Sequence, residues 1–62
     1  MRIYGRKIMN NAGKLVDFIR TNNLNEARRM GMAVDMNLDH SQFYSQAGYI
    51  MESTYKKLQS TH

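Results

Sequence analysis

Few side chains in this sequence have the chemistry of a catalyst or a metal ligand. His40 and His62 are its only imidazoles, and neither has a second histidine or a carboxylate at the spacing of a metal site. Asp39 precedes His40, but no nucleophile accompanies the pair, so we interpret them as neighbours at a helix start. The four glycines are isolated and do not form a phosphate-binding loop. We therefore expect no enzyme, no metal, no cofactor and no small-molecule substrate.

The length and composition favour one small domain that gains stability by association. The chain has 62 residues and no cysteine. A domain this short buries only about 60% of the surface of its unfolded chain, and small domains without disulfides often oligomerise. No apolar run approaches the ~20 residues of a membrane span. We expect residues 1–62 to form a single cytoplasmic domain that self-associates and has no membrane partner.

The strongest helical pattern lies in residues 40–59. Asp39 is expected to cap this helix by accepting a bond from the backbone N–H of Gln42, and Leu38 and Phe43 have the spacing of a hydrophobic staple. At 100° per residue, the apolar side chains span an arc of roughly 160°. The members of this arc are Phe43, Tyr44, Ala47, Gly48, Ile50, Met51, Thr54, Tyr55 and Leu58. Such a wide arc predicts packing against two elements, either both in this chain or one of them in another chain.

A first helix is predicted over residues 11–22. Its apolar residues share one face, and either Asn10 or Asn11 can cap its start. Those apolar residues are Ala12, Leu15, Val16 and Ile19. Polar residues that favour caps and turns follow, so the helix is expected to end near Asn22.

A second helix is predicted over residues 24–36. Asn23 and Glu26 have the spacing of a capping box at its start. Gly31 on its apolar face either permits close approach of another helix or weakens the helix locally. The connection to residues 40–59 is short, which predicts an antiparallel hairpin of these two helices. The expected fold is all-α, a small three-helix domain.

The predicted hairpin is similar to one unit of a helical-repeat family. Its facing small and apolar residues are Leu24, Ala27, Val34, Ala47, Gly48 and Met51. Over about 35 residues, these positions resemble a single hairpin of the tetratricopeptide family. The resemblance implies a pair of packed helices. It carries no functional residue, because the family's fuller aromatic and proline pattern is missing.

Residues 1–10 are predicted as a basic arm. The net charge of the chain is +4, and the whole excess lies in residues 1–20. Gly5 weakens any regular assignment, and one short strand does not bury itself, so the arm is expected to be either ordered or frayed. It could contact nucleic-acid phosphates or an acidic partner, or remain solvated.

The function that we favour is a regulatory protein-interaction module that self-associates and presents helix faces to a protein partner. Met32 and Met36 lie one turn apart, off the main apolar face of their predicted helix, and Tyr49 sits among polar residues. Exposed methionine and tyrosine are enriched at protein interfaces. The predicted interface residues are Met32, Met36, Tyr44, Gly48, Tyr49, Met51 and Tyr55.

The alternative function is a nucleic-acid-binding regulator with a helix-turn-helix-like fold. Its contact residues would be Arg2, Arg6, Lys7, Arg28 and Arg29. The most regular predicted helix, over residues 40–59, is nearly neutral and has few basic or amide side chains near its start. A recognition helix usually carries such side chains, so we rank protein interaction above nucleic-acid binding.

Overall fold

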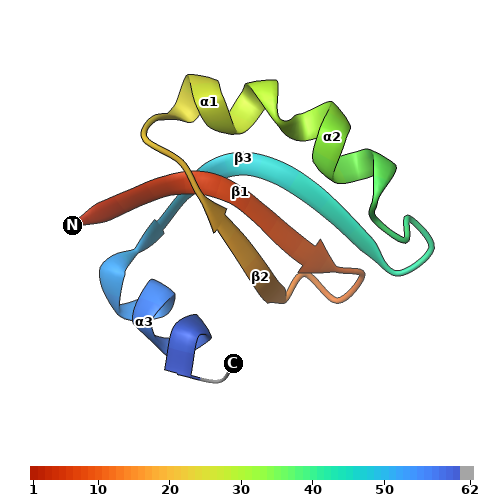
Figure 1. Cartoon of the computed structure of the whole chain (residues 1–62). Helices are drawn as coiled ribbons and strands as arrows, with labels where there is room; N and C mark the ends of the chain where they lie inside the picture. Colours follow the sequence, from red (N-terminus) through yellow and green to blue (C-terminus); the bar gives the residue numbers. More distant parts are fainter. Residues whose placement is uncertain (61–62) are drawn as a thin grey trace.

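The computed structural model describes residues 1–60, which form a three-stranded antiparallel sheet and three short helices (Figure 1). The elements, in chain order, are β1 (Arg2–Asn10), β2 (Leu15–Arg20), α1 (Leu24–Arg29), α2 (Gly31–Met36), β3 (Phe43–Met51) and α3 (Glu52–Ser60). The strand order is β2-β1-β3, so β1 is the central strand. The fold is therefore α+β, and the predictions of an all-α fold, a helical hairpin and a tetratricopeptide-like unit are wrong.

The segment predicted as a basic arm is the centre of the sheet. β1 pairs antiparallel with β2 on one side and along its whole length with β3 on the other. β1 is not a lone strand, because β2 and β3 pair with it on both sides. Both partner strands lie in segments that were predicted as helices. Gly5 is required in β1, since a Cβ there would collide with the carbonyl oxygen of Ile19 and the ring of Phe18.

A β-hairpin replaces the helix predicted over residues 11–22. The side chain of Asn10 accepts bonds from the backbone N–H of Ala12 at 3.0 Å and from that of Lys14 at 2.9 Å. Gly13 has a φ of 78°, which favours glycine at this turn position. Asn10 therefore stabilises the turn between β1 and β2 and does not cap a helix.

The helix predicted over residues 24–36 is present as two short helices. The side chain of Asn23 accepts a 2.9 Å bond from the backbone N–H of Glu26, as the capping-box spacing predicted. The helical run is interrupted at Met30, between α1 and α2. Gly31 was expected either to permit close approach of another helix or to weaken the helix. The group that lies close to Gly31 is instead the guanidinium of Arg6 from β1.

The helix predicted over residues 40–59 is a strand followed by a short helix. Burial alternates along β3, so Ile50 is 8% exposed whereas its neighbour Met51 is 48% exposed. The aromatic side chains of β3 and the β-branched Ile50 favour a strand. This preference was missed because the same residues also fit a helical arc. Only the part from Glu52 onward is helical, as α3.

Asp39 belongs to a turn and does not cap a helix. Its carboxylate accepts bonds from the backbone N–H of Ser41 at 3.0 Å and from the Ser41 hydroxyl at 2.6 Å. The backbone N–H groups of Gln42 and Phe43 bond to the Asp39 carbonyl oxygen instead of its side chain. The predicted hydrophobic staple of Leu38 and Phe43 is wrong, because Phe43 begins strand β3 and not a helix.

This turn makes a prediction about titration. The Ser41 hydroxyl bond, followed by the Ser41 backbone N–H, lowers the pKa of Asp39 below its usual value. Because the folded pKa is the lower one, any stability from this carboxylate is present above the unfolded pKa and is lost as the pH falls through the folded pKa. In an NMR titration, Ser41→Ala should raise the Asp39 midpoint toward the unfolded value. An unchanged midpoint would show that Ser41 does not hold the carboxylate.

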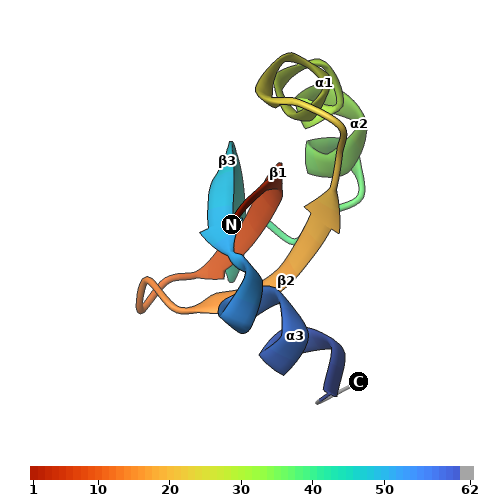
Figure 2. The ribbon, with the colours of Figure 1, turned by 90° about the vertical axis from the view of Figure 1, so that its left-hand side faces the viewer.

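The hydrophobic core is small and lies on one face of the sheet. Ile3, Phe18 and Ile50 are buried there, with Tyr55 and Leu58 of α3 packed against them. On the opposite face, α1 and α2 cover β1 and β3, and Ala27 is the buried apolar residue of this layer (Figures 1 and 2). The self-association expected from the sequence stays a prediction.

Candidate functional site

The longer of the two edge strands in the sheet is β3. β3 has nine residues and lies at the side of the sheet opposite β2. In Figure 2 it lies at one margin of the sheet, with β1 beside it. Each edge strand presents a row of N–H and C=O groups that no strand of its own sheet satisfies.

The composition of β3 makes this edge unusual. Natural sheets protect long edges with lysine, proline, bulges or a covering element. The sequence of β3 is FYSQAGYIM, which contains no charged residue and no proline. Its pairing with β1 continues from Phe43 to Met51 without a shift in register. β3 is therefore long and regularly paired, and its sequence lacks the charge and the proline that protect an edge.

Most of the predicted interface residues gather at this edge. Tyr44 is 41% exposed, Tyr49 44% and Met51 48%, and Gly48 lies in the same strand. Tyr44 and Gly48 project to the same face of the sheet as Ile50, whereas Tyr49 and Met51 project to the face with α1 and α2. Exposed side chains thus flank the edge on both faces.

The exposed methionines of α2 lie on the side of the helix opposite Val34. Asp35 of α2 accepts a 2.5 Å bond from the Ser45 hydroxyl of β3, which fixes one side of the helix toward β3. Met32 lies about 60° from Asp35 around the helix axis and about 160° from Val34, and Met36 extends the same side by one turn. Met32 is 79% and Met36 80% exposed. We call the outer edge of β3 together with Met32 and Met36 the β3 strip.

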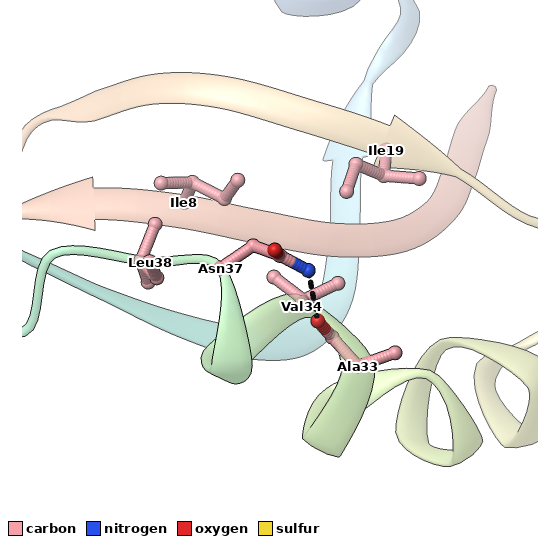
Figure 3. A pocket seen from close by; sticks show the side chains of 6 residues that line it. All are labelled: Ile8, Ile19, Ala33, Val34, Asn37 and Leu38. Carbon is pink, nitrogen blue, oxygen red and sulfur yellow. Dashed lines mark hydrogen bonds between the residues drawn. The ribbon is translucent and has the colours of Figure 1, made fainter.

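The other side of α2 faces away from the strip, across an apolar groove (Figure 3). The groove has a volume of about 320 Å³ and lies between α2 and strands β1 and β2. Asn37 is its only polar lining residue, and its amide donates a 3.0 Å bond to the Ala33 carbonyl oxygen. The residues that line it are Ile8, Ile19, Ala33, Val34, Asn37 and Leu38. None of these side chains is a catalytic acid, base or nucleophile.

Tyr55 does not belong with the other predicted interface residues. It lies on α3, and its ring meets the ring of Phe18 edge to face, with 5.9 Å between the centroids. Arg20 lies over the same ring at 5.6 Å from its centroid. Tyr55 is therefore part of the packing between α3 and the sheet.

Arg6, which was grouped with the nucleic-acid contacts, instead holds the two layers together. Its Nε donates a 3.0 Å bond to the Ser45 hydroxyl, and its Nη1 donates a 3.2 Å bond to the carbonyl oxygen of Ala27. Its side chain is 12% exposed, and its Nη2 lies 4.0 Å from the Asp35 carboxylate. This arginine joins β1 to α1, α2 and β3.

The remaining basic residues of the alternative function are dispersed. Arg2 projects to the face with α1 and α2, whereas Lys7 projects to the opposite face beside Gly48. Arg28 and Arg29 are exposed on the last turn of α1. Over the described residues 1–60, the structure does not bring the five predicted contacts into one groove and does not show the expected helix-turn-helix arrangement.

A cluster that the sequence did not predict lies at the end of the strip. Arg2 stacks over the ring of Tyr49 at 4.7 Å from its centroid, and Tyr4 meets the same ring at 6.1 Å, edge to face. Arg2 and Tyr4 flank Ile3, and their cross-strand partners are Met51 and Tyr49. The alternation of Arg2, Ile3 and Tyr4 was the signal that could have placed them on one face of a strand.

Within residues 1–60, no group of three or more His, Cys, Asp or Glu side chains could hold a metal ion. His40 Nε2 lies 2.7 Å from the backbone carbonyl oxygen of Asp35, and His62 is outside the described residues. In the same part of the chain, no helix has both the length and the apolar character needed to cross a bilayer.

Comparison with known proteins adds no family assignment. No protein-family model matches this chain, and neither a curated protein nor a solved structure matches it.

Proposed function

We propose that this chain is a non-enzymatic protein-interaction module that self-associates and uses the β3 strip as its binding surface. The observation that carries the proposal is the long outer edge of β3, which has neither charge nor proline to prevent pairing. Strand addition to such an edge is a common mode of protein recognition, in which main-chain hydrogen bonds supply affinity.

The side chains of the strip support the same function. Met32, Met36, Tyr44, Tyr49 and Met51 are all at least 41% exposed. Methionine and aromatic side chains are enriched in interfaces, and their burial would add the apolar surface that the small core lacks. From the sequence, helix faces were expected to meet the partner, whereas a strand supplies the larger part of the contact that we propose.

The nucleic-acid alternative has weaker support. Arg6 is largely enclosed, and the other predicted contacts lie on two faces of the sheet and on α1. A phosphate backbone is usually followed by a continuous row of cations. The proposed partner is therefore a protein.

The test is a molar-mass titration by light scattering. Met32→Ser combined with Met36→Ser should keep the circular dichroism spectrum, because both side chains are exposed, and should raise the dissociation constant about tenfold or more through lost apolar burial. Arg28→Ala combined with Arg29→Ala is the matched control, since these residues are exposed on the neighbouring helix. The control should associate like the parent chain.

Two results would contradict the proposal. One is the mass of a single chain at every concentration, up to about 1 mM, a range in which even weak complexes form. The other is tight binding to duplex DNA at about 200 mM salt that the arginine variant abolishes, which would favour the alternative function.

A further inference from the structure

We infer that the partner at the β3 edge is a second copy of this chain, paired antiparallel about a two-fold axis at Ala47. The product is a closed dimer in which two three-stranded sheets join into one continuous sheet. This inference rests on the proposed self-association and adds to it the strand register, the symmetry and the number of copies.

Alternate residues of β3 direct their backbone N–H and C=O groups away from β1, toward the outer edge of the sheet. The N–H of Glu52 bonds to the carbonyl oxygen of Met1 at 3.1 Å, one position beyond the strand pair. In an antiparallel ladder, every second residue bonds to the same neighbour, so Ile50 and Gly48 direct their backbone groups toward β1. The residues between them direct theirs away from β1. The outward-directed residues are Ser45, Ala47, Tyr49 and Met51.

A second bond gives the same assignment from the other side of the sheet. The N–H of Thr21 bonds to the carbonyl oxygen of Tyr4 at 2.9 Å, so Tyr4 directs its backbone groups toward β2. Its cross-strand partner Tyr49 forms a non-hydrogen-bonded pair with it and therefore faces outward.

The register follows from symmetry and length. Ala47 is the middle residue of β3, and a two-fold axis there opposes all nine residues of one strand with all nine of the other. Any other two-fold register leaves part of β3 unpaired. With the axis at Ala47, outward-directed Ser45 lies opposite outward-directed Tyr49, so each pair can exchange both backbone bonds.

The side chains in this register are compatible on both faces. Tyr44 of one copy lies opposite Ile50 of the other, and Phe43 lies opposite Met51. Aromatic residues opposite β-branched or other apolar residues are favourable cross-strand pairs. Like charges directly opposite are destabilising, and β3 contains no charge, so copies with a net charge of +4 meet along a neutral line.

The helical layer supports the same axis. α1 and α2 lie over the part of the sheet that contains β1 and β3, and Met32 and Met36 are exposed on the side of α2 opposite Val34. A two-fold axis at this edge brings the same side of α2 from both copies toward each other. The exposed methionines thereby gain a partner of matching character.

The opposite edge of the sheet explains why association stops at two copies. β2 has six residues, carries Asp17 and Arg20, and shifts register against β1 between Ile8 and Met9. Short length, charge and irregular pairing are the features that protect an edge. An interface that uses the same surface on both copies closes on itself, so the dimer does not extend into a fibre.

Single cysteines test the register, because the chain has none of its own. In a hydrogen-bonded antiparallel pair the Cα atoms are about 5.5 Å apart, within the range for a disulfide, so Ala47→Cys should form a linked dimer on mild oxidation. Tyr49→Cys is the matched control on the same face. In the proposed dimer the two copies of position 49 are offset by four residues, so they lie roughly 13 Å apart. The Tyr49→Cys variant should therefore form the disulfide at least ~10-fold more slowly than Ala47→Cys.

A second variant tests the edge without the need for a crosslink. The N–H of Ala47 points outward, so Ala47→Pro removes a donor from the dimer and none from the β1 ladder. This variant should retain the sheet spectrum and have the mass of one chain at concentrations where the parent has the mass of two. Gln46→Pro is its control, since the Gln46 N–H bonds to β1 and its loss should unfold the chain.

The outcomes separate this inference from the proposed function. A dimer in which Ala47→Cys does not link, or links no faster than Tyr49→Cys, overturns the register and leaves self-association standing. A folded Ala47→Pro variant that still forms dimers overturns the use of the β3 edge. A mass that grows without a plateau overturns the closed symmetry, and a parent chain that stays monomeric overturns both proposals.

Discussion

Replacing Gly5 by alanine is expected to unfold much of the population at room temperature. The new Cβ would be only 2.6 Å from the Phe18 ring and would also collide with the carbonyl oxygen of Ile19, a backbone atom in the neighbouring strand. That atom cannot move unless β1 and β2 separate. We expect the free energy of unfolding to fall by about 3 kcal/mol or more, a large part of the stability of so small a domain. Urea denaturation followed by circular dichroism measures it.

Gly48→Ala is the matched control for this substitution. Gly48 pairs directly with Gly5 and projects to the same face of the sheet. A Cβ there would lie 3.0 Å from Cε of Lys7, the far end of a flexible side chain that can move. The control should change the free energy of unfolding by less than about 1 kcal/mol. Equal stability of the two variants would show that Gly5 is not enclosed between strands.

Ile50→Asp is expected to have a similarly large effect. Ile50 is 8% exposed and packs with Ile3 and Phe18 beneath α3. A buried carboxylate without a partner costs several kcal/mol, which is comparable to the whole stability of such a domain. The variant should lack a cooperative thermal transition when it is followed by circular dichroism.

Met51→Asp is the control for the Ile50 substitution, and the pair discriminates a strand from a helix. Met51 is 48% exposed and projects to the opposite face of the sheet, so Met51→Asp should remain folded in dilute protein. The predicted helix over residues 40–59 had both residues within one apolar arc and would lose stability with either change. Two unfolded variants would therefore contradict the strand.

The sequence predicted local features more successfully than the fold. The bond from Glu26 N–H to the Asn23 side chain is short in range, so residue spacing alone identified it. The turn at Asn10 to Gly13 is equally local, but it was overlooked because the apolar residues that follow it also fit a helical period. β2 contains Leu15, Val16, Phe18 and Ile19, a composition that favours a strand over a helix.

The larger error arose because strands were judged singly. β1 has no stability without β2 and β3, so the evidence for each strand depended on the other two. In β3, Tyr44 and Tyr49 lie on opposite faces, which hides the alternation of period two and widens the apparent helical arc. An arc of roughly 160°, which is wider than one neighbouring helix covers, was itself an indication of the wrong period.

The residues of the candidate site were selected without knowledge of the correct fold, and their role stays a prediction. Met32, Met36 and Tyr49 were selected because they lie off the predicted core faces, and Tyr44 and Met51 because the predicted helical arc was too wide for one neighbour. All five side chains are exposed in the structure. Arg6 was misplaced because its role as a buried link between layers depends on contacts distant in sequence.

The neutrality of β3 determines how ionic strength should act on assembly. Two copies that each carry +4 repel one another over the Debye length, about 8 Å at physiological salt, before their edges meet. Added salt screens this repulsion and leaves the uncharged contact intact, so the association rate of the chain rises with salt. Attraction to phosphate has the opposite sign, because salt weakens it. The direction of a simple salt titration therefore reports whether the chain recognises its own neutral edge or a polyanion.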